Sequence, residues 1–163
     1  MPYDVPIAVT QQLIVLENGS YSLPQLVLVS AAEPAVFAMN GTGTGAGVVL
    51  ESPATGPQVL NTPATPSTAG DSIAIYCAGL GAVTPLQMAG TAAAAQSAST
   101  LNSVIVTIGG QGAQVSFAGL SPVMIGWYEV DVTVPSGIAP GPSVPVVISV
   151  AGIASAPVTM AIQ

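Results

Sequence analysis

Short runs of apolar, often β-branched residues alternate with segments rich in Gly, Pro, Asn and Ser along the whole chain. Runs of this length, with turn signals about 8–12 residues apart, are typical of a β-sandwich. The pattern therefore predicts an all-β fold. The expected strands are residues 11–17, 24–31, 35–39, 47–52, 72–78, 103–109, 113–119, 127–135, 144–152 and 157–163.

Two stretches do not fit the strand pattern. Residues 88–100 have the Ala content of a helix but no convincing apolar stripe, so they are expected to form a loop with at most one helical turn. Residues 52–70 are rich in Pro and Thr and are expected to run extended over the surface. Both stretches are therefore interpreted as connections between strands.

The two ends of the chain resemble each other. Placing Pro2 on Pro135 aligns the first 30 residues with the last 30 without a gap. We therefore expect residues 1–31 to form a β-hairpin that repeats the C-terminal hairpin and ends a preceding unit. A complete sandwich is expected over residues 32–163. The aligned pairs include Val5 and Ile138, Leu13 and Val146, Val15 and Ile148, Gly19 and Gly152, Ser22 and Ser155, Pro24 and Pro157, Val27 and Met160, and Val29 and Ile162.

The first hairpin is more apolar than its C-terminal counterpart. Side chains on a strand alternate between two faces, and both registers of the first hairpin contain large apolar residues. Such a hairpin is expected to be covered on its second face, either by residues 32–163 or by a neighbouring chain. The predicted assembly interface consists of Ile14, Leu16, Leu26 and Leu28. The C-terminal copy has at these positions Val147, Ser149, Thr159 and Ala161.

Lys, Arg and His are absent, and seven carboxylates give the chain a net charge of −7. Nucleic acid is not an expected partner, because its phosphates need cationic side chains. Arginine clamps, Schiff-base lysines and histidine relays are excluded for the same reason. Exposed strand edges are usually protected by Lys and other charges, so the edges of this chain are expected to be covered by association.

Two carboxylates are the strongest candidates for acid–base chemistry. Glu129 and Asp131 lie two positions apart on an expected strand, hence on one face and about 6.6 Å apart. Glycosidases use carboxylates separated by roughly 5–10 Å. No cationic or bulky aromatic group is expected around the pair, so a solvated strand face is the favoured interpretation. Asp71 and this pair lack the dense Asp/Asn/Gly loop of a calcium site. No catalytic, cofactor or metal site is predicted.

Trp127 and Tyr128 form the candidate ligand platform. The two side chains point to opposite faces of one strand, so one is expected in the core, while the other could stack on a sugar or a partner protein. Cys77, the only cysteine, alternates with apolar residues and is expected to be a buried, unreactive side chain. Residues 41–47, GTGTGAG, are followed by an expected strand and not by a Lys. They therefore predict a turn and not a phosphate-binding loop.

Several ordered segments resemble a known family. They are IYCAGLGAVTP, VTIGGQGAQVSFAGLSP, WYEVDVTVPSGIAPG and VPVVISVAGIASAPVTMAIQ. With these segments the chain resembles the Solibacter-type carboxy-terminal domain, a module of uncharacterised function that ends large secreted bacterial proteins. More loosely, it resembles the IPT/TIG class of immunoglobulin-like domains. The resemblance implies an immunoglobulin-like β-sandwich and an exported parent protein, and it carries over no catalytic residue. The complete loss of cations departs from the family.

The sequence favours a non-enzymatic, extracellular structural module that associates with copies of itself or with tandem neighbouring domains, as a subunit of a filament or surface layer. The alternative is a carbohydrate-binding or adhesive module of a secreted protein, with a surface polysaccharide as its partner. A hydrolase and a monomeric spacer are weaker alternatives. The first residues, MPYDVPIAV, lack the basic region of a secretory signal. No run of about 20 apolar residues predicts a transmembrane segment.

Overall fold

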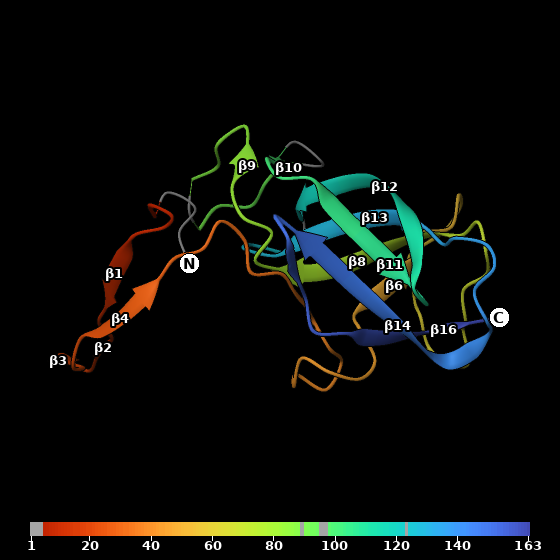
Figure 1. Ribbon diagram of the computed structural model, residues 1–163, viewed down its shortest axis with the longest axis horizontal. Coiled ribbons are helices and arrows are strands. Elements are labelled where there is room, and N and C mark those ends of the chain that lie inside the picture. The colour runs from red at the N-terminus through yellow and green to blue at the C-terminus, as the bar shows by residue number, and fades with distance from the viewer. Residues whose placement is uncertain (1–4, 89, 95–97, 123) are drawn as a thin grey trace.

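The computed structural model describes the chain except for residues 1–4, 89, 95–97 and 123. The described residues form strands, turns and loops, and contain no helix. Most of them build one curled antiparallel β-sheet, and a separate hairpin extends from one end of it (Figure 1). The predicted all-β fold is therefore confirmed.

The strands agree with the expected ones, with two differences. The first expected strand is split into two, and there are five additional strands of two residues each. Their bounds are β1 Thr10–Leu13, β2 Leu16–Glu17, β3 Ser20–Tyr21, β4 Gln25–Leu28, β5 Ala35–Val36, β6 Val49–Glu51, β7 Val59–Leu60, β8 Ser72–Ala78, β9 Val83–Thr84, β10 Ser99–Thr100, β11 Val104–Ile108, β12 Gln111–Leu120, β13 Tyr128–Thr133, β14 Gly141–Val150, β15 Ile153–Ala154 and β16 Val158–Ile162.

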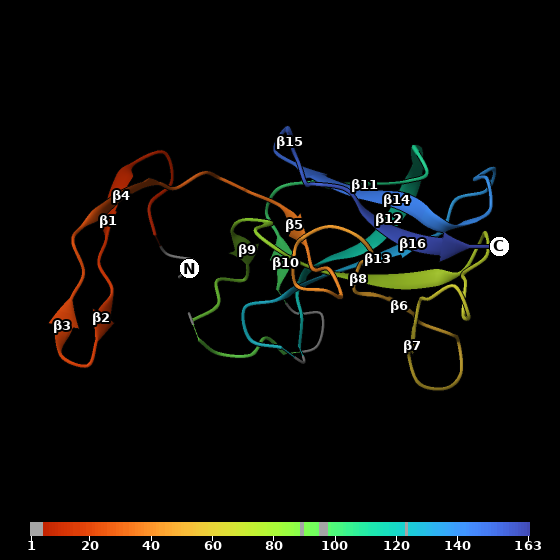
Figure 2. The ribbon, with the colours of Figure 1, turned by 90° about the horizontal axis from the view of Figure 1, so that it is seen from below.

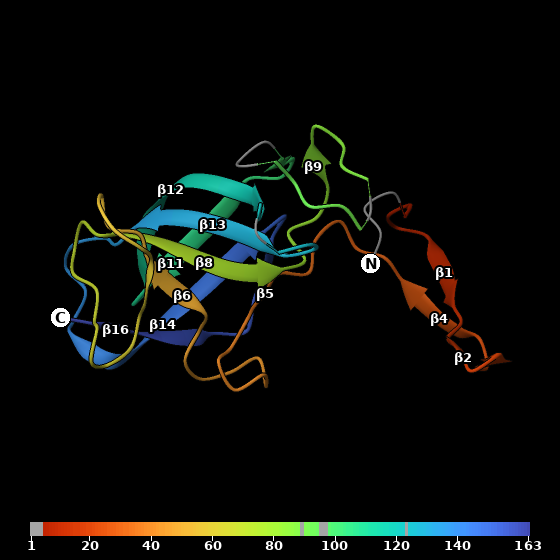
Figure 3. The ribbon, with the colours of Figure 1, turned by 180° about the vertical axis from the view of Figure 1, so that it is seen from behind.

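The large sheet has the strand order β15-β14-β11-β12-β13-β8-β6-β7, with β16 paired to β14 and β5 paired to β8. Strand β12 connects the two layers, because its first residues pair with β11 while the rest pair with β13. A bulge between Val115 and Phe117 bends β12 between these pairings. As a result, β11, β14 and β16 lie over β8 and β13 (Figures 2 and 3). The predicted β-sandwich is confirmed in this layered form, while the immunoglobulin-like connectivity stays a prediction.

The core lies between the two layers. Ile73 and Ile75 of β8 and Val130 of β13 face Val106 of β11 and Ile148 of β14, and all five side chains have no solvent-exposed surface. Along β14 burial alternates with period two from Val144 onward, as a strand with one covered face requires. Cys77 also lies in this cluster, so its predicted burial is confirmed.

The expected connections differ in outcome. The described part of residues 88–98 is a loop, as predicted, and the two residues after it form β10. Residues 52–70 are only partly at the surface. Asn61 and Ser67 of this segment are buried, and the Asn61 side chain accepts a hydrogen bond from the Ala161 backbone N–H and donates one to the Ala161 carbonyl oxygen. The segment therefore covers the outer edge of β16, a role that its composition did not predict.

The N-terminal hairpin lies apart from the sandwich. Strands β1 and β4 pair only with each other among the described residues, and so do β2 and β3 at the tip. The hairpin extends away from the end of the sandwich that carries β9 and β10 (Figures 1 and 2). The expectation that residues 32–163 cover the hairpin is therefore wrong, because the ribbon reaches outward and does not fold back.

Candidate functional site

The N-terminal hairpin repeats the backbone pairing of the C-terminal hairpin. In the first copy Gln11 pairs with Val27 and Leu13 pairs with Gln25. The aligned residues of the second copy pair in the same register, Val144 with Met160 and Val146 with Val158. At the tips, Leu16 pairs with Tyr21 as Ser149 pairs with Ala154. The repeat seen in the sequence is therefore also a repeat in strand register.

The turns of the two hairpins have the same conformation. Asn18 and Gly19 have φ angles of 49° and 81°, and Ala151 and Gly152 have φ angles of 50° and 82°. Two consecutive residues with positive φ form the type I′ turn that matches the twist of paired strands. In this conformation Asn and Gly are favoured and Ala is not. The N-terminal turn therefore carries the better-suited sequence.

A serine fixes the bend of each hairpin in the same way. The Val15 backbone N–H donates to the Ser22 Oγ at 3.0 Å, and the Ser22 N–H donates to the Val15 carbonyl oxygen at 2.8 Å. At the aligned positions Ile148 and Ser155 make the same two bonds, at 3.1 and 2.8 Å. The Ser-x-Pro sequence that marks both copies therefore has a structural explanation.

The two faces of the N-terminal hairpin differ in polarity. One face, here called the leucine face, is apolar except for Thr10 and Gln12 toward its base, and it corresponds to the outer side of the C-terminal hairpin. The other, here called the mixed face, carries four polar side chains that the sequence prediction of a uniformly apolar hairpin overlooked. The leucine face consists of Ile14, Leu16, Tyr21, Leu26 and Leu28, with Thr10 and Gln12 toward its base, and the mixed face of Gln11, Leu13, Val15, Glu17, Ser20, Gln25 and Val27.

The leucine face is open to solvent. The exposed fractions of its side chains run from 46% for Ile14 to 74% for Tyr21, with Leu28 at 71%. Soluble monomers rarely expose a contiguous apolar patch of more than a few hundred Å². The assembly interface of Ile14, Leu16, Leu26 and Leu28 stays a prediction. The exposure of these side chains makes them available for one.

The link between hairpin and sandwich is tightly packed. Val29 and Ala32 are buried, and the Glu33 backbone N–H donates to the Gly79 carbonyl oxygen at 2.8 Å. A Cβ atom at Gly79 would lie 1.9 Å from the Glu33 carbonyl oxygen, so no residue with a side chain fits there. The Tyr128 hydroxyl donates to the carbonyl oxygen of Gly81 in the same segment. The direction in which the hairpin leaves the sandwich is therefore set by these contacts.

The carboxylate pair lies on the outer face of the other layer. Glu129 is only 9% exposed, and its cross-strand neighbour on β8 is Tyr76. Burial, and then the charge of Asp131, raise the pKa of Glu129, while a hydrogen bond from Ser121 opposes this effect. Burial also raises the pKa of Asp131, although its hydrogen bond with Glu129 lowers it.

This arrangement corrects the interpretation of the pair as a solvated strand face without aromatic neighbours. Tyr76 lies beside Glu129, and burial, followed by the charges of Glu129 and Asp131, raises the pKa of the Tyr76 hydroxyl. The Tyr76 ring also makes an edge contact with Trp127, at 6.1 Å between ring centroids. Tyr76 and Glu129 are neighbours because β8 and β13 pair in this register. Neither strand's sequence alone gives the register, so the sequence could not predict that Tyr76 lies beside Glu129.

The two residues of the candidate ligand platform have separate roles. Tyr128 is buried in the core, as predicted for one of the two, and is therefore not available as a platform. Trp127 is partly exposed and packs against Phe37, with 4.4 Å between ring centroids. The candidate platform is thus reduced to Trp127, with Phe37 on one side of the indole.

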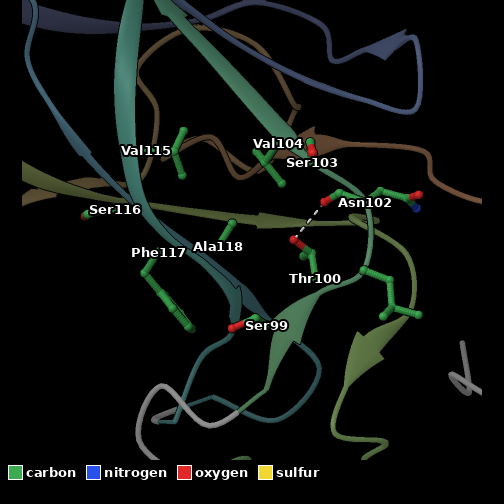
Figure 4. A pocket seen from close by; sticks show the side chains of 10 residues that line it. Ser99, Thr100, Asn102, Ser103, Val104, Val115, Ser116, Phe117 and Ala118 are labelled. Atoms are coloured by element: carbon green, nitrogen blue, oxygen red, sulfur yellow. Dashed lines mark hydrogen bonds between the residues drawn. The ribbon is translucent and has the colours of Figure 1, made fainter.

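A shallow cavity of about 250 Å³ opens where β12 diverges from β11 (Figure 4). Val104, Val115 and Phe117 line it with several serines, and the Thr100 hydroxyl donates to the Asn102 carbonyl oxygen at its rim. None of its lining residues is charged or titratable.

The predicted turn at residues 41–47 also has no charged or titratable side chain. The Thr42 backbone N–H donates a hydrogen bond to the Asn40 side-chain oxygen there.

Within the described residues, no three His, Cys, Asp or Glu side chains gather closely enough to hold a metal ion. The described part of the chain also contains no helix long and apolar enough to cross a membrane.

No family model, no curated protein and no solved structure matches the chain. The fold and the exposed hairpin define the class of the molecule as an all-β sandwich with an additional, unpacked copy of its own closing hairpin.

Proposed function

We propose that the chain is a non-enzymatic structural module of a secreted or cell-surface protein. It packs against copies of itself or against tandem neighbouring units through its N-terminal hairpin, as part of a filament or surface layer. Its sandwich is immunoglobulin-like, and the resemblance to the Solibacter-type domain supports an exported parent protein. Residues 1–31 represent the closing hairpin of a preceding unit, and residues 32–163 the complete one.

One observation carries the proposal. A hairpin with the register, turn and serine contacts of a packed sandwich hairpin is held away from its own sandwich with its leucine face in solvent. Burying a large apolar side chain stabilises a protein by about 1.5–3 kcal/mol, so five exposed ones are a strong driving force for association. Within the described residues β1 and β4 pair only with each other, so the backbone groups of their outer edges also favour association.

The charge distribution supports the same function. The chain has no Lys or Arg, so neither its strand edges nor its hairpin carry the basic side chains that normally prevent association. For the same reason trypsin-like proteases have no cleavage site in the sequence, which suits a protein outside a cell.

The proposal is tested by sedimentation velocity and negative-stain microscopy of the full chain over a range of concentrations. We expect the weight-average sedimentation coefficient to rise with concentration and ordered assemblies to appear. A single monomeric species at every concentration would instead identify the chain as a spacer and overturn the proposal.

Acidification is expected to strengthen association. The seven carboxylates repel one another, and no cationic side chain is available to form an ion pair that acid could break. Protonation toward about pH 4 therefore removes repulsion between copies without loss of a side-chain ion pair. Sedimentation at matched ionic strength checks this expectation, and dissociation on acidification contradicts it.

A carbohydrate-binding or adhesive module is the second candidate. It is favoured by the partly exposed Trp127, which lies next to Tyr76 and the Glu129–Asp131 pair, since aromatic rings and hydrogen-bonding carboxyls are the groups that hold sugars. Retention of the chain on insoluble polysaccharides, abolished by Trp127→Ala but not by Leu16→Asp, would support this function over self-association.

A further inference from the structure

We propose that the leucine face of the hairpin packs on the leucine face of a second copy of this chain, about a two-fold axis, with the two hairpins antiparallel. This inference rests on the proposed function and names its partner, its contact surface and its symmetry. The mixed face remains toward solvent in this arrangement.

The choice of face follows from the polar residues. Gln11, Glu17 and Gln25 share the mixed face, so packing that face into an apolar contact would bury two amides and a carboxylate. The leucine face carries two polar side chains, Thr10 and Gln12, both toward its base, and no charged residue. A hairpin with one apolar and one mixed face has the pattern of a ribbon that is covered on one side only.

The hairpin does not fit the core of another copy's sandwich. In an exchange of hairpins, Gln25 and Glu17 would take the places of Val158 and Val150, whose side chains are 0% and 1% exposed. An amide and a carboxylate without partners would then lie in an apolar core. The repeated backbone is therefore not used for strand exchange between identical chains, and the opposite face makes the contact.

The charge of the chain favours its own copy as the occupant. A basic partner would gain nothing at the uncharged leucine face, because no carboxylate of the described residues lies on it. Two copies, each with a net charge of −7, can meet at this face without bringing carboxylates into direct contact. Closed two-fold contacts between identical surfaces are the commonest form of association between copies.

The antiparallel orientation increases the buried area. A stable interface uses about 20–30 residues a side, which is more than one face of a hairpin supplies. The sandwich end beside the hairpin exposes further large apolar side chains, here called the apolar rim (Figure 1 shows β9 and β10 at this end). Antiparallel pairing brings each hairpin tip to the rim of the partner copy. The rim consists of the exposed side chains of Leu86 and Met88 after β9, Leu101 after β10, and Met124 and Ile125 before β13.

Cysteine cross-linking of the full chain tests the contact and its symmetry. Cys77 is fully buried, and burial raises the pKa of its thiol, so an introduced cysteine is the one reactive thiol. Ile14 lies near the middle of the hairpin, where the two-fold axis would pass, so we expect Ile14→Cys to form a disulfide-linked dimer under mild oxidation. The matched control is Val15→Cys, which is similarly exposed on the mixed face and is expected to remain largely monomeric.

Charge substitutions measured by sedimentation complete the test. Leu26→Asp on the leucine face is expected to weaken association by about 100-fold or more, whereas Gln25→Asp on the adjacent position changes it little. Both side chains are exposed in the single chain, so both variants are expected to fold, which circular dichroism confirms.

The outcomes separate the two proposals. Association of the native chain that neither Leu26→Asp weakens nor Ile14→Cys cross-links overturns the leucine-face contact while the structural function stands. Weakening by Leu26→Asp without cross-linking of Ile14→Cys overturns the two-fold arrangement and identifies a head-to-tail contact. Equal cross-linking of the two cysteine variants also overturns it. A native chain that is monomeric throughout overturns both proposals.

Discussion

The N-terminal and C-terminal hairpins share a backbone but not an environment. They have the same register, the same type I′ turn and the same pair of serine contacts. Yet Val146, Ile148 and Val158 of the second copy are completely buried, while the first copy has no sandwich against it. Residues 45–47 and Ser67 also hydrogen-bond along the outer edge of β16, and β4 has no such neighbour among the described residues.

The comparison separates two kinds of information in the sequence. The Gly turn, the Ser-x-Pro sequence and strand propensity determine the local geometry of a hairpin, so both copies have it. The side chains on each face determine which surface the hairpin can bury. Polar residues replace apolar ones on the inner face of the first copy, and leucines replace small residues on its outer face, so the preferred contact side is reversed.

Exchanging aligned residues on the inner faces gives the largest expected difference between the hairpins. Val158→Gln places an unpaired amide in a fully buried site and is expected to lower the free energy of unfolding by about 2–4 kcal/mol. The reverse change at the aligned position, Gln25→Val, is expected to alter it by less than about 0.5 kcal/mol, because the site is exposed. Urea unfolding followed by circular dichroism measures both. Equal effects would mean that the hairpins have similar environments.

On the outer faces, Leu16→Asp and Ser149→Asp form the corresponding pair. Leu16→Asp is expected to weaken self-association at least about tenfold, because it places a charge on the leucine face. Ser149→Asp occupies the aligned position in the C-terminal hairpin and is expected to leave both association and stability nearly unchanged. Analytical ultracentrifugation of the two variants gives the comparison, and equal tolerance would remove the leucine face as an interface.

Ser22 and Ser155 make the same two hydrogen bonds and differ in burial. Replacing each serine therefore measures how strongly its bend is buried. Ser155 is buried, so Ser155→Ala leaves the Ile148 N–H without its Oγ partner and is expected to cost about 1–2 kcal/mol. Ser22 is exposed, and water can replace its contact with Val15, so Ser22→Ala is expected to cost below about 0.5 kcal/mol. Thermal unfolding measures both values. A Ser22→Ala effect as large as that of Ser155→Ala would show that the N-terminal bend is buried in solution.

The carboxyl pair gives the smallest effect. Since burial raises the pKa values of Glu129 and Asp131, the folded chain binds protons more tightly than the unfolded chain there. The contribution of this pair to stability is therefore greatest below the usual carboxyl pKa range and falls as pH rises through the raised values. Glu129→Gln is expected to raise Tm at pH 7 by roughly 1–3 °C and to flatten its decline above the usual carboxyl pKa range. Glu17→Gln, the same charge change on the exposed hairpin, is the control and should leave the slope intact.

Local patterns predicted most of the fold. The strand at 72–78 was predicted to the residue, because its alternating β-branched side chains lie between clear turn signals. The repeat of the closing hairpin could also be read, since both copies keep the same turn and serine positions. The two-residue strands β7, β9 and β10 could not, because their pairing depends on neighbours distant in sequence.

The sites were harder to predict because they depend on pairing between strands. Asn61 and Ser67 look like loop residues until β16 lies beside them. The burial of Glu129 depends on Tyr76 of β8, and the sequence of β13 alone indicates a solvated face. The position of the N-terminal hairpin is set by close backbone contacts at Gly79 and Gly81, which leave no trace in apolar patterning.

The packed link at Gly79 and Gly81 has a geometric consequence for the proposed assembly. A joint in which the Ala31 and Glu33 carbonyl oxygens lie against glycines cannot swivel freely, so each ribbon leaves its domain along one direction. In the proposed two-fold dimer, this direction would fix the angle between the two sandwiches. That angle would then be encoded in two residues that have no side chain.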